Sequence, residues 1–98
     1  MDLQERFEKV DEDEYLQFDR VREKLSQRPD VHAFILLDKI MPPPDRGRDM
    51  VAAAAHDVIY LAPEPEELNK LLSDEQILEL VRCGVHYDAD GDGLAMFA

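Results

Sequence analysis

The sequence has 98 residues, of which 23 are acidic and 11 are basic, so its formal net charge is -12. The length is that of one domain covering residues 1–98. The 45% of apolar residues suffices for a small core and argues against a disordered acidic tail. Phosphate backbones and anionic membranes are bound through basic surfaces, so we expect no direct contact with nucleic acid and none with a membrane.

The lack of a recognisable signal peptide and the presence of only one cysteine predict a cytoplasmic protein. Cys83 is the single cysteine, so no disulfide can form within the chain, whereas small secreted domains usually carry several. The first six residues are charged from Asp2 onward and lack the apolar stretch of a signal peptide. The longest apolar runs, 33–37 and 51–55, are far shorter than the roughly 20 residues that cross a membrane as a helix.

The N-terminal part of the chain predicts helices. Apolar side chains recur in steps of three and four over residues 3–28, which is typical of one long helix or two short ones. Asp11 is placed to cap the second, with Glu14 as its reciprocal partner. Pro29 separates this region from the very apolar stretch 30–41. Its spacing favours a buried helix, and a central strand is the alternative because a short apolar run fits either period.

The middle of the chain combines a loop signal with a strand signal. Three prolines open a polar loop at residues 42–49. Residues 50–55 stay undecided, because their four alanines favour a helix locally. The β-branched and aromatic side chains that follow predict a strand at residues 57–62.

Two further helices are predicted before the last hairpin. A proline and two glutamates in the first turn predict a helix over residues 65–72. Ser73 and Gln76 have the spacing of a capping box for a helix over 74–83. Gly84 then supplies the stop at its C-terminal end.

The C-terminal residues predict a β-hairpin. Strands at 85–88 and 94–97 flank a turn with two Asp-Gly pairs, in which glycine is expected to take the positive φ. The hairpin should pair with the 57–62 strand. The predicted fold class is α+β, a single small domain in which three to four helices pack on a small antiparallel sheet. Its predicted core is Phe18, Val21, Leu25, Phe34, Leu37, Ile40, Ile59, Leu61, Leu68, Leu71, Ile77, Leu80, Val81, Leu94 and Met96.

The same turn carries a candidate metal site. Asp88, Asp90 and Asp92, followed by Gly93, have the spacing of the first oxygen ligands in a calcium loop and resemble half of an EF-hand loop over six residues. The bidentate glutamate of such a loop would fall one residue beyond Ala98. Ordinary turn chemistry explains the same aspartates and is the favoured interpretation, with ion binding as the alternative. No cofactor is predicted.

The other candidates for chemistry are one cysteine and three histidines. Cys83 and His86 have a C-x-x-H spacing that suits two zinc ligands, but His32 and His56 could join them only if four segments converge. A lone cysteine beside a helix end is most often a small buried apolar residue, and His86 is expected to point outward from the hairpin. Because no acid–base pair at a meaningful spacing is visible, the sequence predicts a protein that is not an enzyme.

Acidity is the remaining functional signal, and residues 61–98 alone hold 9 acids against 2 bases. The preferred hypothesis is a small, acidic, non-enzymatic interaction or regulatory protein that binds another protein, a basic one among the options, with homo-oligomers left open. One alternative is a divalent-ion or small-ligand binding domain built on the turn at 88–93, and another is an inhibitor that imitates DNA. The predicted interaction face consists of Glu64, Glu66, Glu67, Asp88, Asp90 and Asp92.

Overall fold

The computed structural model describes residues 1–41, 49–55 and 57–97. Within these residues the chain forms four α-helices, a short 3-10 helix and four strands. In chain order they are α1 Leu3–Glu14, η1 Phe18–Arg20, α2 Pro29–Ile40, β1 Val51–Ala55, β2 Val58–Leu61, α3 Pro65–Leu71, α4 Asp74–Arg82, β3 Val85–Asp88 and β4 Gly93–Phe97. This arrangement confirms the predicted α+β class, including the C-terminal hairpin of β3 and β4.

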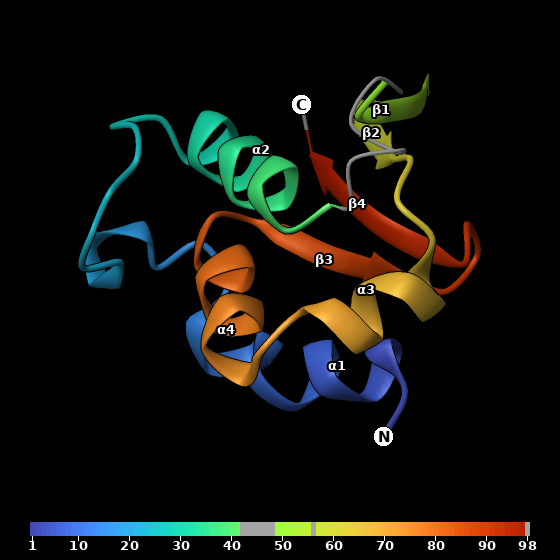
Figure 1. Ribbon diagram of the computed structural model, residues 1–98, viewed down its shortest axis with the longest axis horizontal. Helices are drawn as coiled ribbons and strands as arrows, with labels where there is room; N and C mark the ends of the chain where they lie inside the picture. Colours follow the sequence, from blue (N-terminus) through green and yellow to red (C-terminus); the bar gives the residue numbers. More distant parts are fainter. Residues whose placement is uncertain (42–48, 56, 98) are drawn as a thin grey trace.

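The sheet is antiparallel throughout, with the strand order β1-β2-β4-β3. The hairpin joins β2 as predicted, through the register Ile59↔Met96. The central strand β4 buries Leu94, Ala95 and Met96. Figure 1 shows α1, α3 and α4 gathered near β3, while β1 and β2 lie at the opposite corner of the molecule.

The first helix is shorter than the predicted element at 3–28. Asp2 caps α1 by accepting a hydrogen bond from the Glu5 backbone, and the Glu5 side chain accepts one from Asp2 in return. Asp11 lies inside α1, so it does not cap a second helix. The helix ends at Glu14 because Leu16 adopts a φ of 60° and donates its backbone N–H to the Val81 carbonyl, which turns the chain toward α4.

The remaining helices follow the prediction closely. The helix interpretation of 30–41 is confirmed by α2, and the alternative of a central strand is wrong. The capping box of Ser73 and Gln76 is present at the start of α4. Gly84 ends α4 with a φ of 95°, a conformation that glycine adopts without steric cost.

The undecided residues 50–55 form an edge strand. Ala53, Ala54 and Ala55 pair with β2, so the pairing outweighs the local preference of alanine for helix. Every residue of β1 is exposed, so this strand adds little to the core. The predicted proline-rich loop at 42–49 lies, except for Asp49, outside the described residues.

The core sits between the sheet and the helices, and its membership differs from the prediction at several positions. Leu25 and Leu71 were expected inside but are 40% and 39% exposed. Phe18, Phe34, Ile40 and Ile59 are only partly buried. The core also includes residues absent from the predicted core, among them Leu3, Phe7, His32, Ala33, Leu36, Leu72, Val85 and Ala95. Cys83 is buried as predicted.

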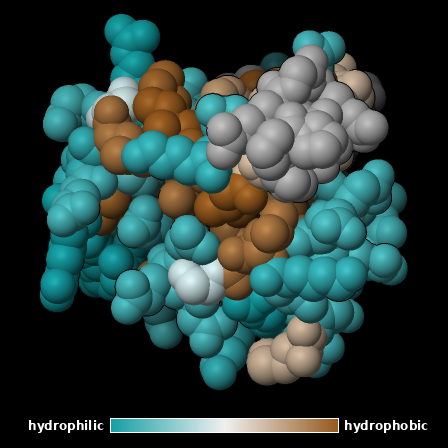
Figure 2. All heavy atoms as spheres, in the orientation of Figure 1, coloured by the Kyte–Doolittle hydropathy of each residue, from teal (hydrophilic) through white to brown (hydrophobic). Residues whose placement is uncertain are grey.

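The outer surface is mainly polar. Figure 2 shows one face of the molecule, on which hydrophilic side chains dominate and hydrophobic atoms form an interrupted band. None of the described helices is both long and apolar enough to cross a membrane.

Candidate functional site

Two adjoining hollows lie along α1 where it packs against the edge strand β3. We call them together the α1–β3 groove. Tyr87 of β3 lines both hollows. The helix contributes a stripe at intervals of three and four residues, as expected for one helix face. This stripe consists of Leu3, Gln4, Phe7, Glu8, Asp11 and, directly after the helix, Tyr15.

The first hollow, about 290 Å³ in volume, is acidic. We call it the acidic hollow. Its carboxylates come from the N-terminus, from the start of α3 and from the hairpin turn, and no lysine or arginine is among its described lining residues. The lining consists of Asp2, Leu3, Gln4, Glu64, Pro65, Glu66, Asn69, Tyr87 and Asp92.

The second hollow, about 330 Å³ in volume, is lined by rings and two carboxylates. We call it the aromatic hollow. The ring of His86 stacks on Phe97, with centroids 4.8 Å apart and planes 25° apart. Tyr15 meets the His86 ring edge-on, with its ring centroid 6.0 Å from that of His86. The lining consists of Phe7, Glu8, Asp11, Tyr15, His86, Tyr87 and Phe97.

Two polar atoms of the aromatic hollow have no hydrogen-bond partner. They are Asp11 Oδ1 and His86 Nδ1, and they are the only side-chain atoms in the described part of the chain that are both buried and unsatisfied. A buried polar atom without a partner typically costs about 1–3 kcal/mol. Both belong to side chains that line the same hollow, so the cost is concentrated at one site.

Tyr87, which lines both hollows, is held by a hydrogen bond to the hairpin turn. Its hydroxyl donates a hydrogen bond of 2.5 Å to Asp92 Oδ1. This bond, assisted by burial, raises the pKa of Tyr87 to about 12. Burial, with a contribution from the charge of Asp11, also raises the pKa of Tyr15. Both phenols therefore stay protonated and neutral at physiological pH.

The structure brings together half of the predicted interaction face. Glu64, Glu66 and Asp92 line the acidic hollow, whereas Glu67, Asp88 and Asp90 do not. The positive φ expected of a glycine in the turn falls on Asp92 instead, at 51°. Aspartate tolerates that conformation better than most residues.

The aspartate-rich turn is organised by its own backbone. Asp88 Oδ1 accepts hydrogen bonds from the N–H groups of Asp90 and Gly91, as expected of turn chemistry. In the described ranges of the chain, no three side chains of histidine, cysteine, aspartate or glutamate are grouped to hold a metal ion. Ion binding by Asp88, Asp90 and Asp92 stays a prediction.

The cysteine and histidine candidates are dispersed. Cys83 is buried, and burial together with the charge of Glu79 raises the pKa of its thiol to about 12, which leaves it a poor nucleophile. His32 is fully buried; its Nδ1 accepts the Leu25 N–H at 3.0 Å, and its Nε2 lies 3.2 Å from Glu79 Oε2. His56 lies outside the described residues.

His86 is the histidine whose predicted role changes. It does not simply point outward from the hairpin but is half-buried and lines the aromatic hollow. Its neighbours Asp11, Tyr15 and Phe97 lie far from it in the sequence or on the adjacent strand, so the sequence reasoning missed this cluster. The spacing of Gln4, Glu8, Asp11 and Tyr15 along one helix face was the one signal that could have indicated it.

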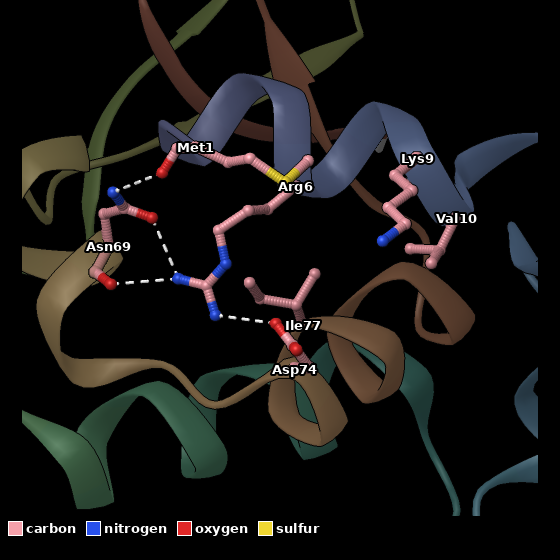
Figure 3. A pocket seen from close by; sticks show the side chains of 7 residues that line it. All are labelled: Met1, Arg6, Lys9, Val10, Asn69, Asp74 and Ile77. Atoms are coloured by element: carbon pink, nitrogen blue, oxygen red, sulfur yellow. Dashed lines mark hydrogen bonds and ion pairs between the residues drawn. The ribbon is translucent and has the colours of Figure 1, made fainter.

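A third hollow, about 370 Å³ in volume, is lined in part by the protein's own Arg6. Figure 3 shows the Arg6 guanidinium directed into it, between Asn69 and Asp74. One of its nitrogens donates to the backbone and side-chain oxygens of Asn69, at 2.9 and 2.8 Å. The other donates to the Leu72 carbonyl at 2.8 Å and to Asp74 at 3.0 Å. This hollow is a structural joint between α1 and the α3–α4 connection.

Comparisons with family models, with curated proteins and with solved structures found no match to this chain. The α1–β3 groove is the candidate site with the most carboxylates and rings at one place. Its carboxylates offer hydrogen-bond acceptors and negative charge, and its rings offer apolar and π surfaces, so the groove is suited to a cation that carries hydrogen-bond donors.

Proposed function

We propose that the protein is a non-enzymatic binding module that takes up a basic segment of another protein in the α1–β3 groove. The observation that carries this proposal is the charge of the lining. Four carboxylates surround the acidic hollow and two more, Glu8 and Asp11, line the aromatic hollow. No lysine or arginine is among the described lining residues of either hollow, so these carboxylates lack a cation of the groove's own.

The length of the groove supports a peptide segment over a single small ion. From Leu3 to Glu14, α1 rises by about 17 Å at roughly 1.5 Å per residue. An extended chain covers that distance with about five or six residues at roughly 3.3 Å each. A basic segment of this length would place alternate side chains into the two hollows.

The electrostatics also favour a protein partner. The net charge of -12 repels nucleic acid and anionic membranes and attracts basic chains at long range. Cys83, the candidate nucleophile, is buried and its thiol pKa is raised. This supports a binding function without catalysis. The hypothesis of a DNA imitator stays a prediction, but a concave groove suits an inserted segment better than it suits a partner's own groove.

Binding of short labelled peptides tests the proposal. Fluorescence anisotropy should detect a peptide of alternating basic and serine residues, and a peptide in which glutamine replaces every basic residue should not bind. The double variant Glu64→Gln, Glu66→Gln should weaken binding about fivefold, since exposed charge pairs contribute about 0.2–1 kcal/mol each.

The matched control is Glu75→Gln, which removes an exposed glutamate from the first turn of α4 just as Glu66→Gln does in α3. Glu75 does not line either hollow, so affinity should stay unchanged. If the basic peptide does not bind, or if Glu75→Gln weakens it as much as the double variant does, the groove is not the site and the proposal is wrong.

A further inference from the structure

We infer that the aromatic hollow is a pocket for one arginine side chain of the bound segment. This inference rests on the proposed function and specifies it, because the acidic hollow alone would accept lysine and arginine alike. Three observations support arginine: two buried polar atoms without partners at one site, a stack of rings beside them, and the contrast with the protein's own Arg6.

A ligand with several N–H groups would satisfy Asp11 Oδ1, and would also satisfy His86 Nδ1 in the tautomer that carries its proton on Nε2. Asp11 Oδ1 and His86 Nδ1 come from different elements, α1 and β3, yet both are buried without a partner at the same hollow. The terminal torsions of aspartate and histidine are broad, so each atom can turn toward an entering donor. A guanidinium presents five N–H donors in a planar fork and serves two acceptors at once, whereas an ammonium is a compact point charge.

The rings provide a surface for a planar cation. His86 and Phe97 are stacked at 4.8 Å, and Phe97 keeps 65% of its surface exposed. Tyr15 meets the His86 ring edge-on, with the two centroids 6.0 Å apart. A guanidinium stacks on aromatic faces and is less strongly hydrated than an ammonium, so it gives up water at lower cost when it enters such a hollow.

The hollow beside Arg6 shows what a satisfied guanidinium looks like in this protein. There, one arginine donates to three oxygens of Asn69 and Leu72 and to the carboxylate of Asp74. In the aromatic hollow, the carboxylates of Glu8 and Asp11 on α1 and the ring of His86 on β3 are present, but no described arginine or lysine lines the hollow. An arginine from a partner would supply the missing donors.

A pair of peptides that differ only in arginine and lysine tests the inference. Affinity is measured by calorimetry with the full chain, using alternating arginine-serine and lysine-serine peptides of equal length. The arginine peptide should bind about tenfold more tightly, the factor that corresponds to roughly one additional charge-assisted hydrogen bond. Backbone NMR shifts should place the difference at Asp11, His86 and Phe97 rather than at Glu64 and Glu66.

Two pocket variants and one control distinguish recognition of arginine by the aromatic hollow from a general attraction between opposite charges. Asp11→Asn should abolish most of the preference for arginine, while Asp13→Asn, which removes the same charge from an exposed position on α1, should leave it intact. His86→Phe keeps a ring against Phe97 and removes the acceptor, so it should reduce the preference as well. The far-ultraviolet circular dichroism of each variant checks that it is folded.

The outcomes distinguish this inference from the proposed function. If both peptides bind equally and Asp11→Asn behaves like Asp13→Asn, the arginine pocket is wrong while the basic-segment function stands. If neither peptide binds, both are wrong. If sedimentation shows that the protein itself dimerises and that Asp11→Asn and His86→Phe disrupt the dimer, the hollow belongs to a contact between two copies and the inference is overturned.

Discussion

Arg6 shows how one side chain can join three helices. Its guanidinium leaves α1 and donates to the backbone of Asn69 and Leu72, at the end of α3, and to Asp74 at the start of α4. The Arg6 side chain is only 17% exposed, whereas that of Asp74 is 95% exposed. The carbonyl contacts should therefore stabilise the fold more than the ion pair does, because exposed ion pairs contribute little.

This difference gives a prediction for stability. Arg6→Ala should lower the free energy of unfolding by about 2 kcal/mol, because it leaves part-buried carbonyls without donors. Asp74→Asn keeps the shape of the helix start and removes only the exposed charge, so it should cost less than about 0.5 kcal/mol. Urea denaturation measures both changes. Equal losses in the two variants would show that the ion pair, and not the carbonyl contacts, carries the joint.

Tyr87 gives a prediction at alkaline pH. Its hydrogen bond to Asp92, with burial, raises its pKa from 10 to about 12, so the unfolded chain loses the phenol proton before the folded protein does. The contribution of Tyr87 to stability is complete below pH 10 and is lost as the pH rises from about 10 to 12. Burial likewise raises the thiol pKa of Cys83 to about 12, which adds to the same loss.

Tyr87→Phe should therefore flatten the decline of stability between about pH 10 and pH 12 without removing it, since Cys83 remains. Asp92→Asn should lower the pKa of Tyr87 toward its usual range, because the charged acceptor is gone. Absorbance titration of the tyrosines, compared with Tyr87→Phe, identifies the late-titrating phenol. An unchanged titration in Tyr87→Phe would contradict the assignment.

At the scale of elements, both ends of α4 were predictable from local signals, whereas the end of α1, which depends on a tertiary contact, was not. The Ser73–Gln76 capping box and Gly84 fixed both ends of α4 from local sequence. The end of α1 depends instead on Leu16, whose backbone bonds to Val81 of α4. No local pattern indicates such a contact, so the apolar spacing continued past Glu14 and predicted one long helix or two short ones over residues 3–28, where the structure has α1 and the short η1.

The candidate site likewise has one part that could be predicted from local sequence and one part that could not. Glu64, Glu66 and Asp92 were predicted from local acid density, and they line the acidic hollow. The aromatic hollow needs Asp11 and His86 to meet across 75 positions of the sequence. That meeting depends on the packing of α1 on β3, which follows from the tertiary fold and not from any short motif.

Gly84 provides a prediction for the joint between these elements. It combines a φ of 95° with a close approach, since a Cβ added here would lie 2.6 Å from Leu16 Cδ2. Gly84→Ala should destabilise the protein by about 2 kcal/mol or more, from left-handed backbone strain of about 1–2 kcal/mol and from the clash. In a Leu16→Ala background the clash disappears, and thermal unfolding should show only the strain remaining. If the background makes no difference, Leu16 is not the obstacle.

At the scale of the whole molecule, the net charge of -12 has opposite effects on folding and on binding. Like charges repel one another in the folded protein, and dissolved salt screens that repulsion. The same salt screens the attraction between the α1–β3 groove and a basic segment. With a Debye length of about 10 Å at 0.1 M ionic strength, both effects should be large below that concentration.

Adding sodium chloride should therefore raise the unfolding temperature of the protein and weaken the binding of the basic peptide. Thermal denaturation and peptide anisotropy, measured over one salt series, give the two slopes, and slopes of equal sign would contradict the electrostatic account. Calcium chloride at matched ionic strength serves as the control. If calcium stabilises no more than sodium does, screening explains the effect. If it stabilises more, and Asp88→Asn with Asp90→Asn removes the surplus, the aspartate-rich turn binds the ion specifically.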